Sequence, residues 1–209
     1  MTILGVLLAG GRARRMGGGD KGLSMLGGRP MMERIIERAQ SQVSVLIINA
    51  NGDVERFKNF EIEVIPDVID GFAGPLAGVL TGLEWAVMHA PEVDWVATFA
   101  TDAPFVPFDL VKRLFSAVYS DNADLACACS NGRSHPVFGL WPVHLADDLR
   151  RAMIDEKIRK IDAWTARYKL IEVDFSIKPI DPFFNVNAPE HLVEAEALLN
   201  TVKKKFYET

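Results

Sequence analysis

Two runs near the amino end, ILGVLLA at residues 3–9 and VSVLIINA at residues 43–50, are almost continuously apolar. A strand that is apolar on both faces needs cover on both sides, which is typical of parallel sheets enclosed by helices. The segment between the two runs, residues 30–42, begins with proline and carries apolar residues at helical spacing. This order predicts a strand–helix–strand unit and therefore an open α/β sheet.

The same alternation continues along the chain. We expect further strands at 61–67, 95–102, 123–130, 135–142 and 170–175, and further helices at 75–90, 107–120, 144–155, 157–168 and 188–208. No Pro/Gly/Ser-rich linker, internal repeat or low-complexity stretch divides the 209 residues. The sequence therefore predicts one domain, residues 1–209, in which a less regular second half is built onto the first.

A glycine-rich stretch, LLAGGRARRMGGGDKG at residues 7–22, joins the first expected strand to the first expected helix. Its charged residues are Arg12, Arg14, Arg15, Asp20 and Lys21, in a chain whose net charge is −5. Glycines let backbone N–H groups turn toward an anion, and open α/β sheets bind ligands at the carboxyl ends of their strands. The stretch lacks the Walker A pattern G-x-x-x-x-G-K-[ST]. It is either a solvated surface loop or a local cradle for a polyanion, and the acidic chain argues against nucleic acid as a partner.

A second feature, FATDAPFV at residues 99–106, ends an apolar strand with Asp102. A carboxylate at this position can bind Mg²⁺, which then bridges phosphate oxygens. It can instead cap the next helix, since Asp is common at that position. Because Pro107 and Asp109 offer a later helix start, we favour the metal role for Asp102.

A third feature, PDVIDGFAGPLAGVL, places Asp67 at the end of an expected strand and small residues at the start of a helix. Gly74, Ala77 and Gly78 leave room for the close approach of a ligand or of another part of the backbone. Packing and binding are equally consistent with this pattern.

Two polar pairs lie in the second half of the chain. Asn185 and Asn187 precede the last expected helix, where one can cap the helix and the other can reach a metal or phosphates. His135 lies at the start of an expected strand with Arg133 nearby. A lone histidine in such a place is more often structural than catalytic.

Several classes of protein are not expected from this sequence. Cys127 and Cys129 lie two residues apart, and we interpret them as small buried hydrophobic residues rather than metal or redox groups. No apolar stretch reaches about 18 residues, so no membrane span is predicted. The start has no basic region of the kind that opens a signal peptide, so we expect the cytoplasm.

Taken together, the motifs resemble those of the molybdenum cofactor guanylyltransferases, the MobA family. The matching pieces, in the order of the family, are LAGGRARRMGGGDKGL, INAN (48–51), IPD (65–67), GPLAG (74–78), TDAPFVP (101–107), HP (135–136) and FNVN (184–187). The first piece is the most specific, because related nucleotidyltransferases share its core and the R-A-R-R-M-G-G form points to the guanylyl branch. The resemblance covers essentially the whole chain.

The resemblance implies a Rossmann-like three-layer nucleotidyltransferase fold with a mostly parallel sheet, and Mg²⁺-dependent transfer of GMP from GTP to the terminal phosphate of molybdenum-bound molybdopterin. GTP contacts are implied at Leu8, Ala9, Gly10, Gly11, Lys21, Asn49, Asp67 and Asp102. Asp102 would also bind Mg²⁺, and the expected catalytic residues are Arg15, Lys21 and Asp102. The remaining candidate ligand contacts are Gly78, Arg133, His135, Asn185 and Asn187, with Arg133 and His135 on the pterin side.

The resemblance also implies a nucleotide-binding half at about 1–107 and an acceptor-binding half at about 108–209. Cofactor-delivery proteins and molybdoenzyme chaperones are expected partners, with no nucleic acid and no membrane. Transfer from CTP to the pterin, transfer to a sugar phosphate and a non-catalytic nucleotide-binding adaptor are the alternatives. The presence of both Lys21 and Asp102 argues against the adaptor.

Overall fold

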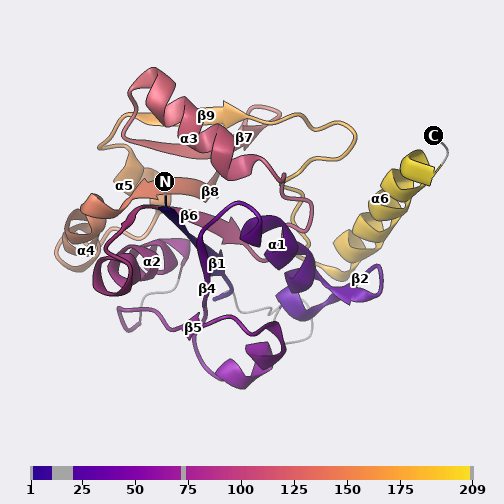
Figure 1. Cartoon of the computed structure of the whole chain (residues 1–209), viewed down its shortest axis with the longest axis horizontal. Helices are drawn as coiled ribbons and strands as arrows, with labels where there is room; N and C mark the ends of the chain where they lie inside the picture. Colours follow the sequence, from indigo (N-terminus) through magenta and orange to yellow (C-terminus); the bar gives the residue numbers. More distant parts are fainter. Residues whose placement is uncertain (1, 11–20, 72–73, 208–209) are drawn as a thin grey trace.

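The computed structural model describes residues 2–10, 21–71 and 74–207. Its centre is a seven-stranded sheet in the order β5-β4-β1-β6-β8-β7-β9 (Figure 1). The strands are β1 (Thr2–Leu8), β4 (Val45–Asn49), β5 (Val64–Ile65), β6 (Val93–Ala100), β7 (Leu125–Ser130), β8 (Arg133–Pro142) and β9 (Leu170–Asp174), with a separate ribbon of β2 (Met25–Leu26) and β3 (Arg29–Pro30). The helices are α1 (Met31–Gln40), α2 (Pro75–His89), α3 (Leu110–Asp121), α4 (Ala146–Ile154), α5 (Ile161–Thr165) and α6 (Pro189–Tyr207), with short 3₁₀ turns η1 (Lys21–Leu23), η2 (Val54–Phe60) and η3 (Val143–Leu145).

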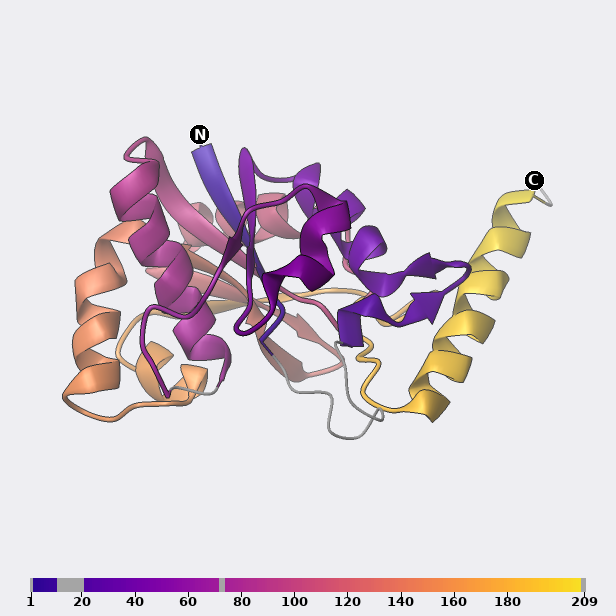
Figure 2. The ribbon, with the colours of Figure 1, turned by 90° about the horizontal axis from the view of Figure 1, so that it is seen from below.

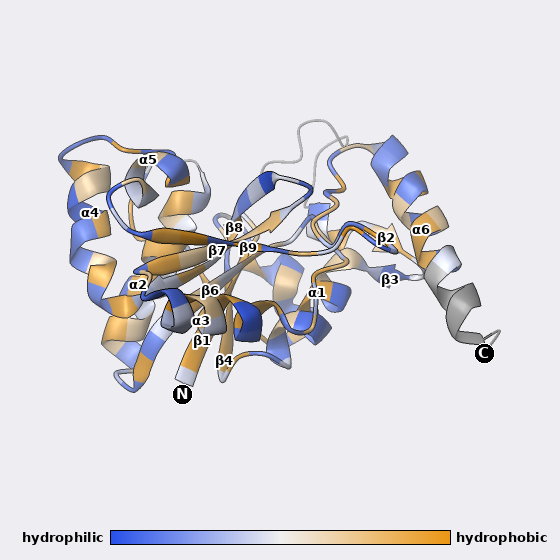
Figure 3. Cartoon of the chain, turned by 90° about the horizontal axis from the view of Figure 1, so that it is seen from above, coloured by the Kyte–Doolittle hydropathy of each residue, from blue (hydrophilic) through white to orange (hydrophobic). Residues whose placement is uncertain are grey.

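Each face of the sheet has its own apolar core. Helices α1 and α3 cover one face through side chains such as Ile35 and Leu114. Helices α2, α4 and α5 cover the other face through side chains such as Leu80, Leu149 and Trp164. The inner strands β1 and β4 are accordingly apolar, and polar residues gather on the outer sides of the helices (Figure 3). The predicted three-layer α/β architecture is therefore confirmed, and it arises because apolar strands were buried on both sides.

The sheet is mostly parallel, and β8 is the exception. β1 runs parallel to β4 and β6, β4 to β5, and β7 to β9, whereas β8 is antiparallel to both β6 and β7. The reversal occurs at Asn131 and Gly132, whose φ angles are 49° and 71°. Two such residues form the tight turn that best matches the twist of a hairpin, and Asn-Gly is its commonest sequence. The end of β7 and the start of β8 therefore lie at the same edge of the sheet as the end of β6.

Some predicted elements were too long and others were missed. The strand expected at 61–67 is reduced to Val64–Ile65, and the helix expected at 157–168 to Ile161–Thr165. At the start of the second element, Lys157 adopts a left-handed conformation with φ 61°, so a helix cannot begin at that residue. The β2–β3 ribbon and η2 have no counterpart among the predicted elements. The two strands have only two residues each, and the 3₁₀ turn η2 does not follow the period of an α-helix.

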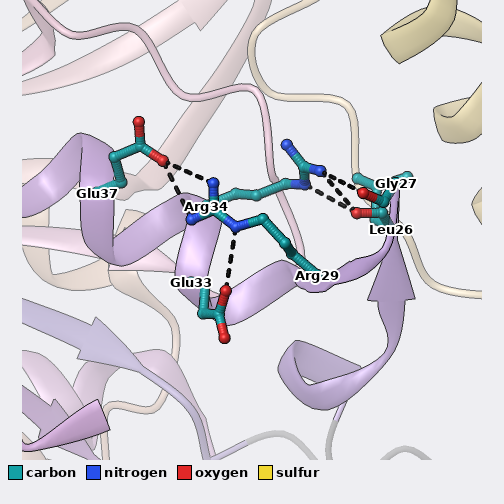
Figure 4. Close-up of polar contacts among 6 residues, drawn as sticks. All are labelled: Leu26, Gly27, Arg29, Glu33, Arg34 and Glu37. Atoms are coloured by element: carbon teal, nitrogen blue, oxygen red, sulfur yellow. Dashed lines mark hydrogen bonds and ion pairs between the residues drawn. The ribbon is translucent and has the colours of Figure 1, made fainter.

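The β2–β3 ribbon connects the segment after Lys21 to two helices. Arg34 of α1 donates to the carbonyl oxygens of Leu26 and Gly27, while Arg29 pairs with Glu33 and Glu37 on the outer side of α1 (Figure 4). The Gly27 N–H donates to Glu196 of α6. Helix α6 projects from the body beside this ribbon (Figure 2). Its packing against a small cluster around Leu26, Met31 and Val186 fixes the last segment of the chain next to the exit from the glycine-rich stretch.

Candidate active site

The carboxyl ends of the parallel strands meet at one edge of the sheet, and most of the predicted site residues lie there. Leu8, the last residue of β1, pairs with Asn49 on one side and with Ala100 on the other. The Ala9 N–H continues this contact by donating to the Asn49 carbonyl at 2.9 Å. Asp102 follows β6 by two residues, and Asp67 follows β5 by two residues. This is the edge at which open α/β sheets bind their ligands.

Three segments far apart in the sequence meet at Lys21. Its ammonium group donates to the side-chain oxygen of Asn187 at 2.5 Å and lies 3.8 Å from Oδ2 of Asp102. The Lys21 and Asp102 side chains keep 23% and 22% of their surface exposed. The arrangement therefore presents a cation, a carboxylate and an amide at one partly open point, which suits a ligand that carries phosphates and a metal ion.

Asp102 is held in an environment that disfavours its charged form. Burial raises the pKa of its carboxyl group, and the nearby Lys21 ammonium opposes that rise only in part. The helix-cap alternative does not apply, because α3 begins at Leu110 with Asp109 at the preceding position. A positive group that approaches Asp102 more closely than Lys21 would stabilise the carboxylate, which is what a bound cation does.

Asn185 supplies an oxygen atom that lacks a partner. Its side-chain Oδ1 is buried and accepts no hydrogen bond from the part of the chain that the structure describes. Such an atom is costly unless a ligand or ion satisfies it. The next residue, Val186, donates its N–H to the Asp102 carbonyl at 2.7 Å, so Asn185 lies beside the Asp102 segment. A carboxylate and amide oxygens are the ligands that Mg²⁺ takes from proteins when substrate phosphates and water complete its shell, so the residues fit the metal.

The hydrogen bonds do not support a capping role for either asparagine. The Asn187 side-chain oxygen accepts from Lys21 instead, and that of Asn185 has no partner among the residues described. Asn187 is linked to α6 through its backbone, since its N–H donates to Nδ1 of His191 at 3.2 Å. Neither side-chain oxygen therefore caps the start of α6.

Asn49, Asn51 and Asp67 form a closed polar cluster at the ends of β4 and β5. Asn49 donates to one carboxylate oxygen of Asp67 at 2.9 Å, and Asn51 donates to the other at 2.8 Å. The Asp67 N–H returns a bond to the Asn51 side-chain oxygen at 2.9 Å. The carboxylate is therefore held in one orientation by two amides. Asn51 was not among the predicted site residues, although it follows Asn49 by two residues and so lies on the same side of an extended chain.

Gly78, on the first turns of α2, packs directly against this cluster. A methyl group at its Cα would lie 2.4 Å from Oδ1 of Asn49 and 2.4 Å from Cδ2 of Leu8. The glycine is therefore required for packing between α2 and the strand ends. A larger residue at this position would affect a ligand by displacing Asn49 and Leu8.

We expect Gly78→Ala to destabilise the fold and to weaken nucleotide binding together. Overpacking costs about 1–3 kcal/mol, which exceeds the gain in helix propensity of up to about 1 kcal/mol. Urea unfolding measures the first effect and calorimetric titration with GTP the second. Gly10→Ala is the matched control for stability, because none of the residues that the structure describes lies within 4 Å of a methyl group there. Equal stabilities of the two variants would contradict the packing role.

His135 lies at the same edge, at the start of β8, and is 7% exposed. Its Nε2 is 2.8 Å from Oγ of Ser130, which donates to the Asp181 carboxylate at 3.0 Å. Its ring packs on Phe183 with centroids 4.7 Å apart. Burial lowers the pKa of His135, and the Asp181 charge opposes that shift. The histidine is thus held in a buried hydrogen-bond network, while Arg133 beside it is exposed.

Part of the predicted site lies in a stretch that the structure does not describe. Gly11, Arg12, Arg14 and Arg15 lie outside the described residues, as does most of the proposed anion cradle.

Cys127 and Cys129 are free thiols buried in β7, and burial raises the pKa of Cys127 to about 11, as expected for small buried hydrophobic residues. Across residues 2–10, 21–71 and 74–207, no three His, Cys, Asp or Glu side chains are grouped as a metal site, and no helix is long and apolar enough to cross a bilayer.

The comparison with known proteins decides the family. The MobA-like NTP transferase domain matches residues 5–169. A molybdenum cofactor guanylyltransferase of Rhodopseudomonas palustris is 51% identical over 193 residues, which cover 92% of this chain and 90% of the relative. This chain belongs to the molybdenum cofactor guanylyltransferase family. The resemblance drawn from its motifs is confirmed, and the protein is a nucleotidyltransferase.

Solved structures show that the fold is shared more widely than the guanylyltransferase sequence. A molybdopterin-guanine dinucleotide biosynthesis protein A of Archaeoglobus fulgidus superposes with a TM-score of 0.72 at 24% identity, covering 95% of this chain and 99% of that one. A Mycobacterium tuberculosis protein in complex with manganese superposes with a TM-score of 0.67 at 14% identity, covering 94% and 99%. At these identities the likeness concerns the fold alone.

Three polar residues in these hydrogen-bond networks were not predicted from the sequence, namely Asn51, Ser130 and Asp181. Ser130 gives no local signal, because it ends an apolar strand. Asp181 does give a sequence signal, because an aspartate commonly starts a turn by accepting from the N–H two residues ahead. In the structure its side chain accepts from the N–H of Phe183 at 3.0 Å.

Proposed function

We propose that this guanylyltransferase-family protein transfers the GMP group of GTP to the terminal phosphate of molybdenum-bound molybdopterin. An oxygen of the acceptor phosphate bonds to the α-phosphorus of GTP, the bond between the α-phosphorus and the bridging oxygen breaks, and pyrophosphate leaves. The observation that carries the proposal is the meeting of Lys21, Asp102 and Asn187 at the ligand-binding edge of the sheet, in a chain about half identical to guanylyltransferases.

The residues act by position and charge. A phosphate oxygen is already nucleophilic near neutral pH, so the main difficulty is to bring two polyanions together. Lys21 would donate to the triphosphate while it keeps its bond to Asn187, since an ammonium group has three donors. Leu8, Ala9 and Gly10 would add backbone contacts, and Gly11 and Arg15 would complete the cradle. Asn49 and Asp67, on the neighbouring strand ends, would hold the nucleoside.

A divalent cation, Mg²⁺, is part of the same proposal. Asp102 and Asn185 would hold it, because one offers a carboxylate in an unfavourable setting and the other a buried oxygen without a partner among the described residues. When bound, Mg²⁺ neutralises charge on the transferring phosphate and on the leaving pyrophosphate. Asn187, already in contact with Lys21, would position the lysine.

The acceptor would approach from the side of Arg133 and His135. A cavity of about 450 Å³ in the second half offers another location, lined by residues that include Ser134, Asp162, Tyr168 and Glu172. Two carboxylates in its wall would repel a phosphorylated acceptor. We therefore place the acceptor phosphate at the sheet edge, where the exposed Arg133 begins β8.

Three broader expectations belong to the proposal and stay predictions. The first is a single domain whose nucleotide half spans about 1–107 and whose acceptor half spans about 108–209, joined by one sheet that contains strands from both. The second is a cytoplasmic location, where GTP is available. The third is contact with cofactor-delivery proteins and molybdoenzyme chaperones.

A thermal-shift panel of GTP, CTP, ATP and UTP, each with Mg²⁺, tests the nucleotide. A ligand at 100 times its Kd stabilises the native state by about 2.7 kcal/mol, which amounts to several degrees for a chain of this size. We expect GTP with Mg²⁺ to give the largest shift, and transfer to molybdopterin to follow the same preference. A larger shift and faster transfer with CTP would replace the guanylyl assignment by the cytidylyl one.

We expect Arg133→Ala to impair transfer by raising the KM for the molybdopterin acceptor about ten- to a hundredfold, because a charge-assisted phosphate contact is worth roughly 1.5–3 kcal/mol. GTP affinity should stay within about twofold of the parent value, given the place of Arg133 in the second half. Steady-state kinetics and calorimetric titration separate the two effects. Lys112→Ala, an exposed cation on α3, is the control. Equal losses in GTP affinity and in turnover would assign Arg133 to the nucleotide side instead.

A further inference from the structure

The Asp181 carboxylate holds two separate parts of the site with a single oxygen. Its Oδ1 accepts from the Ser130 hydroxyl at 3.0 Å and from the Phe183 N–H at 3.0 Å. The first bond leads across β7 to His135, whose Nε2 is 2.8 Å from the same hydroxyl. The second closes the turn that begins the segment 181–187.

The order of donors in this chain of bonds fixes the tautomer of His135. A serine hydroxyl has one hydrogen, and a carboxylate oxygen only accepts. Ser130 therefore donates to Asp181 and accepts from Nε2–H of His135. The neutral ring then carries its lone pair on Nδ1. An orientation of this kind is set by the group behind the histidine.

The segment 181–187 runs from the His135 network to the Lys21 cluster. Its Phe183 ring packs against the rings of His135 at 4.7 Å and Phe138 at 4.9 Å. Farther along, the Val186 N–H donates to the Asp102 carbonyl, and Asn187 accepts from Lys21. The position of Asp181 therefore affects both the His135 network and the Lys21 cluster.

We propose that Asp181 is a positioning residue of the transfer reaction, which holds His135 through Ser130 and holds Asn185 and Asn187 through the turn at Phe183. The inference rests on the proposed function and deepens it. It assigns to one side chain the alignment of acceptor-side and nucleotide-side groups. Misplacement of reacting groups by about 1 Å costs on the order of a hundredfold in rate, so the loss of this anchor should be visible in kinetics.

Because one oxygen accepts both bonds, the oxygen of an amide can replace it. We expect Asp181→Asn to transfer GMP within about threefold of the parent rate, and Asp181→Ala to lose about ten- to a hundredfold in kcat/KM for the acceptor. Asp94→Ala removes an exposed carboxylate at the amino-terminal end of β6 and is the matched control. Parent kinetics in Asp181→Ala, or an equal loss in Asp181→Asn, would overturn the proposal.

Ser130→Ala separates the two arms, because it cuts the link to His135 and leaves the Phe183 turn intact. We expect it to raise the acceptor KM about tenfold and to leave GTP affinity within about twofold. An unchanged acceptor KM would show that the link from Ser130 to His135 does not align the acceptor. If Asp181→Ala does not fold, Ser130→Ala and Asp181→Asn decide the question between them.

Long-range ¹H–¹⁵N spectra of the imidazoles test the alignment without any turnover. The chain has 4 histidines, and a His135→Gln variant assigns the signal. We expect neutral His135 protonated at Nε2 in the parent and in Asp181→Asn, and a mixture of tautomers in Ser130→Ala. A parent tautomer protonated at Nδ1 would overturn the proposal even if GMP transfer is normal. Conversely, a parent protein that transfers no GMP would refute the proposed function while this spectrum still reports on the anchor.

Discussion

Replacing Asp102 with asparagine is expected to lower guanylyl transfer by about a hundred- to a thousandfold and to leave the fold intact. The amide keeps the shape of the side chain but removes the charge that would hold a cation next to the transferring phosphate, and loss of comparable charge stabilisation costs this much in other enzymes. Weak GTP binding should remain through Lys21 and the backbone, but its dependence on Mg²⁺ should disappear. Steady-state transfer and calorimetric titration with and without Mg²⁺ measure both effects.

The stability of the same variant provides an independent check. Burial raises the pKa of Asp102 in the folded protein. The protonated group therefore favours folding, and this contribution is lost as the pH rises through the folded-state pKa. At pH 7 the asparagine variant should melt at the parent temperature or up to about 3 °C higher. The difference in melting temperature should shrink toward pH 4, near the ordinary pKa range of an aspartate.

The transfer assay can contradict the metal role of Asp102. Near-normal transfer by the asparagine variant at ordinary Mg²⁺ would identify Asn185 or Asn187 as the principal Mg²⁺ ligand.

Lys21→Ala is expected to weaken GTP binding about ten- to a hundredfold, because a charge-assisted hydrogen bond to phosphate is worth roughly 1.5–3 kcal/mol. The variant also removes the ammonium group 3.8 Å from Asp102, so the pKa of Asp102 should rise further. Titration calorimetry with GTP measures the first effect. Lys58→Ala is the matched control, since this lysine on η2 is exposed and paired only loosely with Glu55 at 3.7 Å.

An unchanged GTP affinity in Lys21→Ala would exclude Lys21 as a principal phosphate contact. The cations at 12, 14 and 15 would then be the next candidates. Lowered affinity for all four nucleoside triphosphates by the same factor is the expected pattern, because a contact to phosphate does not distinguish bases. A loss confined to GTP would move Lys21 to the base side.

The alternation of strands and helices was predictable because each element shows its own period locally. The runs at 3–9 and 43–50 are apolar throughout, and they became β1 and β4, which are covered on both faces. The two elements that were predicted too long, 61–67 and 157–168, each begin at a residue in a left-handed conformation, Glu61 with φ 54° and Lys157 with φ 61°. A single left-handed residue leaves no periodic trace.

The α/β class, the family and the placement of Asp67 and Asp102 at strand ends follow from the sequence alone, because strand boundaries and motif order are properties of short segments. Which of these residues come into contact depends on the three-dimensional fold. Lys21 and Asn187 are separated by 166 positions, and Ser130 and Asp181 by 51. A hydrophobic pattern specifies which face of a strand is buried, but not which strand lies beside it or in which register. Strand order, the reversal at Asn131–Gly132 and the course of residues 181–187 brought these side chains to one edge of the sheet.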